Sequence, residues 1–165
     1  MKSRQYKGRF HSRLQRILYN DCKPAGRAYM PLTGTCLCGA VRYEASAEPV
    51  FSGHCYCADC QKETGGGHLT IAAVPDATVK MTGTTSTFTK LGGSGQSIER
   101  TFCPKCGSTL FSRPRAMAGM TMLRVGTLDN PSQITPSMSI YTSRAPAWDQ
   151  PSASIPGFPE MPPRP

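Results

Sequence analysis

The chain has 165 residues, of which 38% are hydrophobic, 16 are Gly and 15 are Pro, so we expect one domain with a core and many turns. No apolar run approaches the ~20 residues that cross a bilayer, and none follows the charged N-terminus. We therefore expect no membrane segment, no secretory signal and a cytoplasmic protein. Residues 1–29 carry +7 of the net charge of +9, so the basicity of the whole chain does not indicate a nucleic-acid partner.

Residues 1–29 form a basic extension. Apolar residues recur with helical spacing from Phe10 to Leu18, which predicts a short amphipathic helix at most. The segment has the composition of a transit peptide and also of a basic arm for nucleic acid or membrane. It could equally be an extension upstream of a start at Met30. We favour a disordered extension.

Short segments rich in β-branched and aromatic residues follow, separated by turn residues. We expect strands over 40–45, 69–74, 85–89, 97–102, 109–112, 120–127 and 138–142. The glycine-rich residues 91–96 predict the loop of a hairpin, and 59–63 a single helical turn. The prediction is a mainly β domain over 30–150. The Pro-rich tail, 151–165, should run extended, either loose or against the core.

Eight cysteines occur, and seven of them lie in three clusters. The C-x-C and C-x2-C spacings are too tight for ordinary disulfides within a pair, and no secretory signal is expected. In a reducing compartment such clusters are more often metal ligands. We interpret the eighth, Cys22, as a spare thiol.

The first and third clusters are each followed by glycine. They are Cys36-Leu37-Cys38-Gly39 and Cys103-Pro104-Lys105-Cys106-Gly107. Two thiolates at such spacing can face one ion at about 2.3 Å, but neither pair completes a tetrahedron. Joined, they would give four thiolates, which is the closed pattern of structural zinc, and would clip together segments about 65 residues apart.

The second cluster places Cys55, Cys57 and Cys60 within six residues. Three thiols can converge on one ion and leave its fourth position open, as in catalytic zinc sites. The alternative is a closed site in which His54 or His68 is the fourth ligand. We expect two zinc ions per chain, held by seven cysteines, with Cys55, Cys57 and Cys60 at the catalytic one.

The charge of the second site favours thiol chemistry. Zn²⁺ with three thiolates carries a net charge of −1, which makes it a weaker Lewis acid than zinc with three imidazoles. A thiol at the open position would lose its proton to become a nucleophile, whereas a free thiol is mostly protonated at pH 7. Lys62 could attract a carboxylate, although a solvated surface lysine is the more ordinary interpretation.

At these residues the chain resembles the glutathione-dependent formaldehyde-activating enzyme family, which also includes centromere protein V. The resemblance covers about residues 32–162, and the order and spacing of seven cysteines make it specific. The matching segments are GTCLCGAVRY at 34–43, HCYCADCQK at 54–62, RTFCPKCG at 100–107, GTLDNP at 126–131 and RAPAW at 144–148.

The resemblance implies a β-tent fold and a carbon–sulfur lyase that joins glutathione and formaldehyde into S-hydroxymethylglutathione. It implies a structural zinc on Cys36, Cys38, Cys103 and Cys106, and a second zinc on Cys55, Cys57 and Cys60. The partner would be a small thiol such as glutathione. One departure concerns a histidine that the family often carries before its Arg-x-x-x-Trp segment, because Ser139 occupies that position here.

Two other functions are open. The chain could be a non-catalytic zinc-binding module whose basic N-terminal arm binds nucleic acid or a filament partner. It could also sense metal or oxidants through Cys55, Cys57 and Cys60. We favour the enzyme and do not expect nucleic acid as a partner.

Overall fold

The computed structural model of the chain describes Tyr29–Pro162, which form one compact unit. The amphipathic helix expected over 10–18 and Cys22 lie outside these described residues. Within them, no helix is long and apolar enough to span a membrane.

A small antiparallel sheet has the strand order β1-β2-β5. Its strands are β1 (Leu32–Thr35), β2 (Arg42–Ala45) and β5 (Val79–Thr82). The alternation in β2 buries Tyr43 and Ala45 and exposes the two charged residues between and before them. One face of this sheet is therefore committed to the core.

A large sheet has eight strands in the order β11-β10-β3-β4-β9-β8-β7-β6. Strand β10 runs parallel to β3 and to β11, and the other neighbours are antiparallel. The mainly β prediction is confirmed. The strands are β3 (Phe51–Cys55), β4 (Leu69–Pro75), β6 (Ser86–Leu91), β7 (Ser97–Phe102), β8 (Thr109–Pro114), β9 (Met120–Arg124), β10 (Met138–Ile140) and β11 (Gly157–Phe158).

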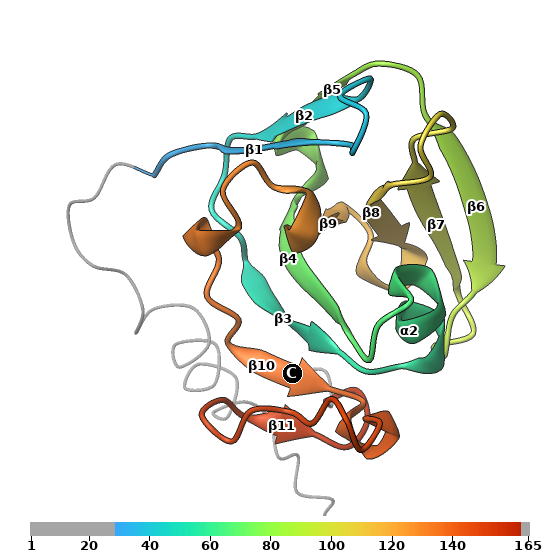
Figure 1. Cartoon of the computed structure of the whole chain (residues 1–165), viewed down its shortest axis with the longest axis vertical. Helices are drawn as coiled ribbons and strands as arrows, with labels where there is room; N and C mark the ends of the chain where they lie inside the picture. The colour runs from blue at the N-terminus through green and yellow to red at the C-terminus, as the bar shows by residue number, and fades with distance from the viewer. Residues whose placement is uncertain (1–28, 163–165) are drawn as a thin grey trace, which may run out of the picture. The chain divides into compact units, whose positions relative to one another are not determined.

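The core lies between the two sheets, and the small sheet lies across one end of the large one (Figure 1). Leu32 and Tyr43 from the small sheet share one buried cluster with Val74, Phe111 and Leu123 from the large sheet. Two of the cysteines, at positions 36 and 103, belong to the same cluster. The four-cysteine region is thus continuous with the hydrophobic core.

One α-helix, α2 (Ala58–Thr64), occurs in the described part, slightly longer than the expected turn at 59–63. Short 3₁₀ turns connect the strands. They are η1 (Asp76–Thr78), η2 (Arg115–Met117), η3 (Val125–Thr127), η4 (Pro131–Gln133) and η5 (Thr142–Arg144).

Several boundaries differ from the sequence predictions for local reasons. The strand expected over 120–127 ends at Arg124, where η3 begins. The strand expected over 138–142 ends at Ile140, because Tyr141 adopts a positive φ of 58° that no strand accommodates. The predicted hairpin is present as β6 and β7. The tail lies against the sheet, since β11 pairs with β10.

Candidate metal centres

Four thiols from the first and third cysteine clusters meet beside the core. The sulfurs of Cys36, Cys38, Cys103 and Cys106 all lie within 4.8 Å of one another. Cys36 directly follows β1, and Cys103 directly follows β7. The structure therefore brings together the two pairs that the spacing predicted.

The two pairs are held by similar backbone turns. The Gly39 N–H donates to the Cys36 carbonyl at 2.9 Å, and the Gly107 N–H donates to the Cys103 carbonyl at 2.9 Å. Both glycines have a positive φ, 73° and 76°, which other residues rarely adopt. This explains why each pair is followed by glycine.

Ser108 links the two turns, a role that no sequence pattern indicates. Its Oγ accepts the Leu37 N–H at 3.0 Å and lies 3.3 Å from the Cys106 sulfur. The hydrogen bond to Ser108 is the main reason that the pKa of Cys106 is lowered to about 5. A lowered pKa favours the thiolate form that binds metals.

The four-thiol site fits a tetrahedral thiolate-bound ion. With a zinc–sulfur distance of about 2.3 Å, tetrahedral geometry places sulfurs about 3.8 Å apart. The Cys36 and Cys38 sulfurs are 3.5 Å apart, and those of Cys38 and Cys103 are 3.8 Å apart. The donor set, four thiols, is that of structural zinc.

Three thiols converge at the junction of β3 and α2. Cys55 ends β3, Cys57 is the N-cap of α2, and Cys60 lies in its first turn. Their sulfurs also lie within 4.8 Å of one another. The Cys60 N–H donates to the Cys57 sulfur at 3.4 Å, so the helix start places these two thiols on one side. We call Cys55, Cys57 and Cys60 the trio.

Hydrogen bonding within the trio separates the acidities of its thiols. Hydrogen bonds from Cys55 and then Cys60 lower the pKa of Cys57 to about 2. The hydrogen bond to Cys57 is the main cause that raises the pKa of Cys55 to about 12, and bonding to Cys55 raises that of Cys60. Cys57 is therefore the first thiol to ionise, and an ion bound by all three would displace protons from the other two.

Neither histidine of the described chain joins the trio. The Nδ1 of His54 lies 3.0 Å from the Thr70 hydroxyl, and the Nδ1 of His68 lies 2.6 Å from the Asp149 carboxylate. The two rings contact each other edge-on, with centroids 4.6 Å apart. No His, Asp or Glu completes a group with the three sulfurs among the residues that the structure describes. The structure therefore does not favour a closed site in which His54 or His68 is the fourth ligand.

Tyr141 lies close to the trio, which sequence reasoning did not detect. In the register of β10 and β3, Ile140 is opposite Cys55, and the Tyr56 N–H donates to the Ile140 carbonyl at 3.0 Å. Burial, followed by the charges of Cys55 and Cys57, raises the pKa of Tyr141. Its phenol therefore stays protonated at neutral pH.

The glycine-rich hairpin loop reaches the same region. A methyl group at Gly93 would lie 3.6 Å from the Tyr141 hydroxyl, so the loop and the phenol are neighbours. The guanidinium of Arg144 stacks over the Tyr141 ring at 5.0 Å. Lys62, in contrast, is exposed on α2.

Ser139 is fully buried, and its hydroxyl has no hydrogen-bond partner among the described residues. It pairs with His54 across the parallel strands β10 and β3. A side chain without exposed surface cannot contact a bound substrate. Ser139 therefore does not take over a substrate contact that a histidine at this position would make.

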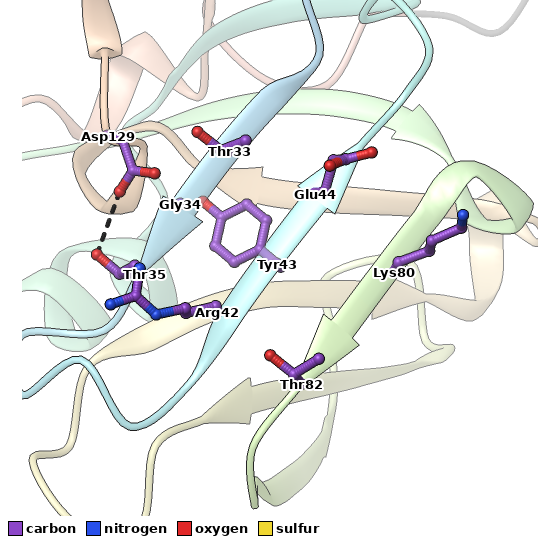
Figure 2. A pocket seen from close by; sticks show the side chains of 9 residues that line it. All are labelled: Thr33, Gly34, Thr35, Arg42, Tyr43, Glu44, Lys80, Thr82 and Asp129. Carbon is purple, nitrogen blue, oxygen red and sulfur yellow. Dashed lines mark hydrogen bonds between the residues drawn. The ribbon is translucent and has the colours of Figure 1, made fainter.

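A concavity of about 380 Å³ lies over the small sheet (Figure 2). It is lined by cross-strand rows of side chains, such as Thr33, Glu44 and Lys80, which share one register on the exposed face. Asp129, at its edge, accepts a hydrogen bond from the Thr35 hydroxyl. Its lining includes no residue of the trio or of α2, so we interpret it as the solvent-facing side of the sheet.

Comparison with known proteins adds a family match. The sequence model of the family described as "Glutathione-dependent formaldehyde-activating enzyme" matches residues 31–144. A curated protein of Halomonas elongata, named "Putative glutathione-dependent formaldehyde-activating enzyme", is 38% identical over 87 residues. That match covers 50% of this chain and 55% of the relative. This chain therefore spans about half the length of the curated relative.

A crystal structure of a Rhodobacter sphaeroides protein is a more distant likeness. It is 21% identical and has a TM-score of 0.49, and the match covers 61% of this chain and 93% of that one. This likeness is too distant to bear on fold or function. The family match is different, because it spans more than half of the chain and includes all seven clustered cysteines. The chain belongs to the glutathione-dependent formaldehyde-activating enzyme family.

Proposed function

We propose that the protein is a zinc-dependent carbon–sulfur lyase-type enzyme that adds a glutathione-like thiol to a small aldehyde. The product with glutathione and formaldehyde is S-hydroxymethylglutathione. The observation that carries this proposal is the difference between the two cysteine groups. Four thiols surround one position and three surround the other, and no fourth side chain completes the trio in the described part of the chain.

Cys36, Cys38, Cys103 and Cys106 would hold a structural zinc, and Cys55, Cys57 and Cys60 a second one. When bound, the second zinc supplies positive charge that lowers the pKa of a thiol at its open position. The donor chemistry fits this assignment, because thiolates select zinc among the abundant divalent ions.

The reaction balances without any further reactant. The sulfur of the thiol forms a bond to the aldehyde carbon, the carbonyl π electrons move to the oxygen, and that oxygen takes up the proton given by the thiol. We propose that the Tyr141 phenol donates a hydrogen bond to the oxygen as its negative charge develops. Its raised pKa keeps this donor protonated at neutral pH.

The chain also shapes the surroundings of this chemistry. The Gln61 side chain donates to the Tyr56 carbonyl at 2.7 Å and to the Arg144 carbonyl at 2.9 Å. It thereby ties α2 to both segments that flank the trio. We propose a cytoplasmic enzyme built from a catalytic domain at 30–150, with 1–29 as an extension and 151–165 as a tail.

The test is the rate at which glutathione and formaldehyde interconvert with S-hydroxymethylglutathione, measured by exchange NMR with and without protein. The zinc-loaded protein should accelerate this exchange above the spontaneous rate. Cys57→Ser should abolish the acceleration, because it removes one of three ligands and the first thiol to ionise. If the wild-type protein gives no acceleration at any glutathione concentration, the proposed reaction is wrong.

A further inference from the structure

Helix α2 supplies two of the three thiols of the trio but has little hydrophobic packing of its own. It has seven residues, ADCQKET, and none of them is fully buried. Isolated helices this short are unstable in water, and most helical stability in proteins comes from an apolar face packed on a core. Another interaction must therefore fix α2, and with it Cys57 and Cys60, against the sheet.

Beside the Gln61 hydrogen bonds described above, the almost fully buried carboxylate of Glu63 provides such an interaction. Glu63, in the last turn of α2, accepts a hydrogen bond from the Arg124 Nε at 2.6 Å and another from the Arg100 Nε at 2.9 Å. The side chains of Glu63, Arg124 and Arg100 are only 8%, 6% and 11% exposed. The two arginines come from β9 and β7, so one carboxylate joins the helix to two strands of the large sheet.

The first turn of α2 is tied to the same part of the sheet. Asp59 receives the Lys90 Nζ at 2.6 Å and the Arg100 Nη2 at 3.4 Å. Arg100 therefore contacts both turns of the helix. Lys90 is half exposed, and exposed ion pairs contribute little, so we expect the buried contacts of Glu63 to dominate.

The geometry of the helix relates this carboxylate to the metal centre. Glu63 follows Cys60 by three residues, which places both side chains on the same side of α2. The ion-pair network contains three cations and two carboxylates and has a net charge of +1. A zinc ion with three thiolates carries −1, so the two groups have complementary charge.

We propose that Glu63, through Arg100 and Arg124, is a positioning residue that sets the geometry of the trio. This inference rests on the trio binding a metal ion, as in the proposed function, but not on the reaction. Residues that orient metal ligands typically change metal affinity by 10- to 100-fold when they are replaced. In the part of the chain that the structure describes, no ion pair involves residues 36–39 or 103–108, so the four-thiol site should not depend on Glu63.

The test replaces Glu63 with Gln, which keeps the shape and removes the charge. Transfer of zinc from the fully loaded protein to a colorimetric chelator gives a release rate for each ion. Cys57→Ser should retain only the four-thiol ion, so the release rate of this variant shows which of the two wild-type rates belongs to the four-thiol site. In Glu63→Gln the trio ion should leave roughly 10- to 100-fold faster, while the four-thiol ion leaves at the wild-type rate.

Glu99→Gln is the matched control. Glu99 neighbours Arg100 on β7 but makes no ion pair within the described residues, so both release rates should equal those of the wild type. Hydrogen exchange of the zinc-loaded protein adds a structural readout. The Gln61 and Gly65 amides, which bond within α2, should exchange faster in Glu63→Gln and not in Glu99→Gln.

A second variant, Arg100→Gln, covers the case in which Glu63→Gln fails to fold. It removes the β7 contacts to both turns but leaves Glu63 paired with Arg124, and it should show the same selective loss. The inference is overturned if either folded variant releases the trio ion at the wild-type rate, or if both ions are released equally faster. A wild-type protein with one ion per chain would overturn the metal assignment of the trio as well, which separates the two failures.

Discussion

The two cysteine groups are built in different ways. The four-thiol group lies at the edge of the hydrophobic core, with Cys36 and Cys103 buried in it, and glycine turns close around it on both sides. The trio lies where a strand meets a short helix without a fully buried residue, and ion pairs hold that helix. The first group is placed so that its loss affects the whole fold. The second is placed at a junction of two elements, and no fourth His, Cys, Asp or Glu joins its three sulfurs among the described residues.

The largest expected effect comes from removing one ligand of the four-thiol group. Structural zinc contributes about 10–16 kcal/mol in apparent binding free energy, whereas a domain of this size has a net stability of about 5–15 kcal/mol. Cys103→Ser should therefore abolish cooperative thermal unfolding, as measured by calorimetry, whereas Cys57→Ser should retain it. A folded Cys103→Ser protein with an unchanged Tm would contradict a structural role for this group.

Beside the trio, Tyr141→Phe should change the reaction rate and leave the fold intact. The variant keeps the aromatic ring under Arg144 and the positive φ, and it removes only the hydroxyl. We expect the accelerated glutathione–formaldehyde exchange to fall by at least about tenfold in kcat, with little change in KM, because the donor acts on charge that develops during the reaction. Zinc content and Tm should stay at wild-type values. An unchanged kcat would exclude the phenol from the reaction.

Tyr43→Phe is the corresponding change on the small sheet, and it should alter stability and not rate. Burial raises the pKa of Tyr43 to about 12, and its hydroxyl lies 2.8 Å from that of Thr127. Near neutral pH the variant should be less stable by about 1 kcal/mol, the usual contribution of one hydrogen bond.

The difference should reverse in alkaline solution. The folded-state pKa is above the unfolded value of 10, so the stability linked to the neutral phenol is fully present below pH 10. It is lost as the pH rises towards 12, where the wild type should lose up to about 2 kcal/mol relative to Tyr43→Phe. Urea unfolding from pH 8 to pH 11.5 measures this. A constant difference across the range would mean that Tyr43 ionises normally in the folded protein.

The thiol clusters could be predicted from the sequence because their signal is local. Spacing and the following glycines indicate two ligand pairs and a trio, and the structure groups them accordingly. Strand β4 and the β6–β7 hairpin were equally predictable from apolar runs and turn residues. These features depend on neighbours within a few residues.

The features that fix the trio are not local. Glu63 meets Arg100 and Arg124, which are 37 and 61 residues away, so no spacing rule relates them. Strand β3 contains Gly53 and His54 and lacks the apolar alternation that marks a strand, and its place in the sheet comes from its pairing with β4 and β10. The positive φ of Tyr141 has no local signal either, since tyrosine rarely adopts it.

The central claim is that the trio binds an ion with one position left for a thiol. X-ray absorption at the zinc edge, combined with metal analysis, tests it directly. The wild type should contain two zinc ions with an average of about 3.5 sulfurs each, rising to about 4 when glutathione is added, while Cys57→Ser should contain one ion with about 4 sulfurs in either case. A single ion in the wild type, or a sulfur number that glutathione does not change, would contradict the account.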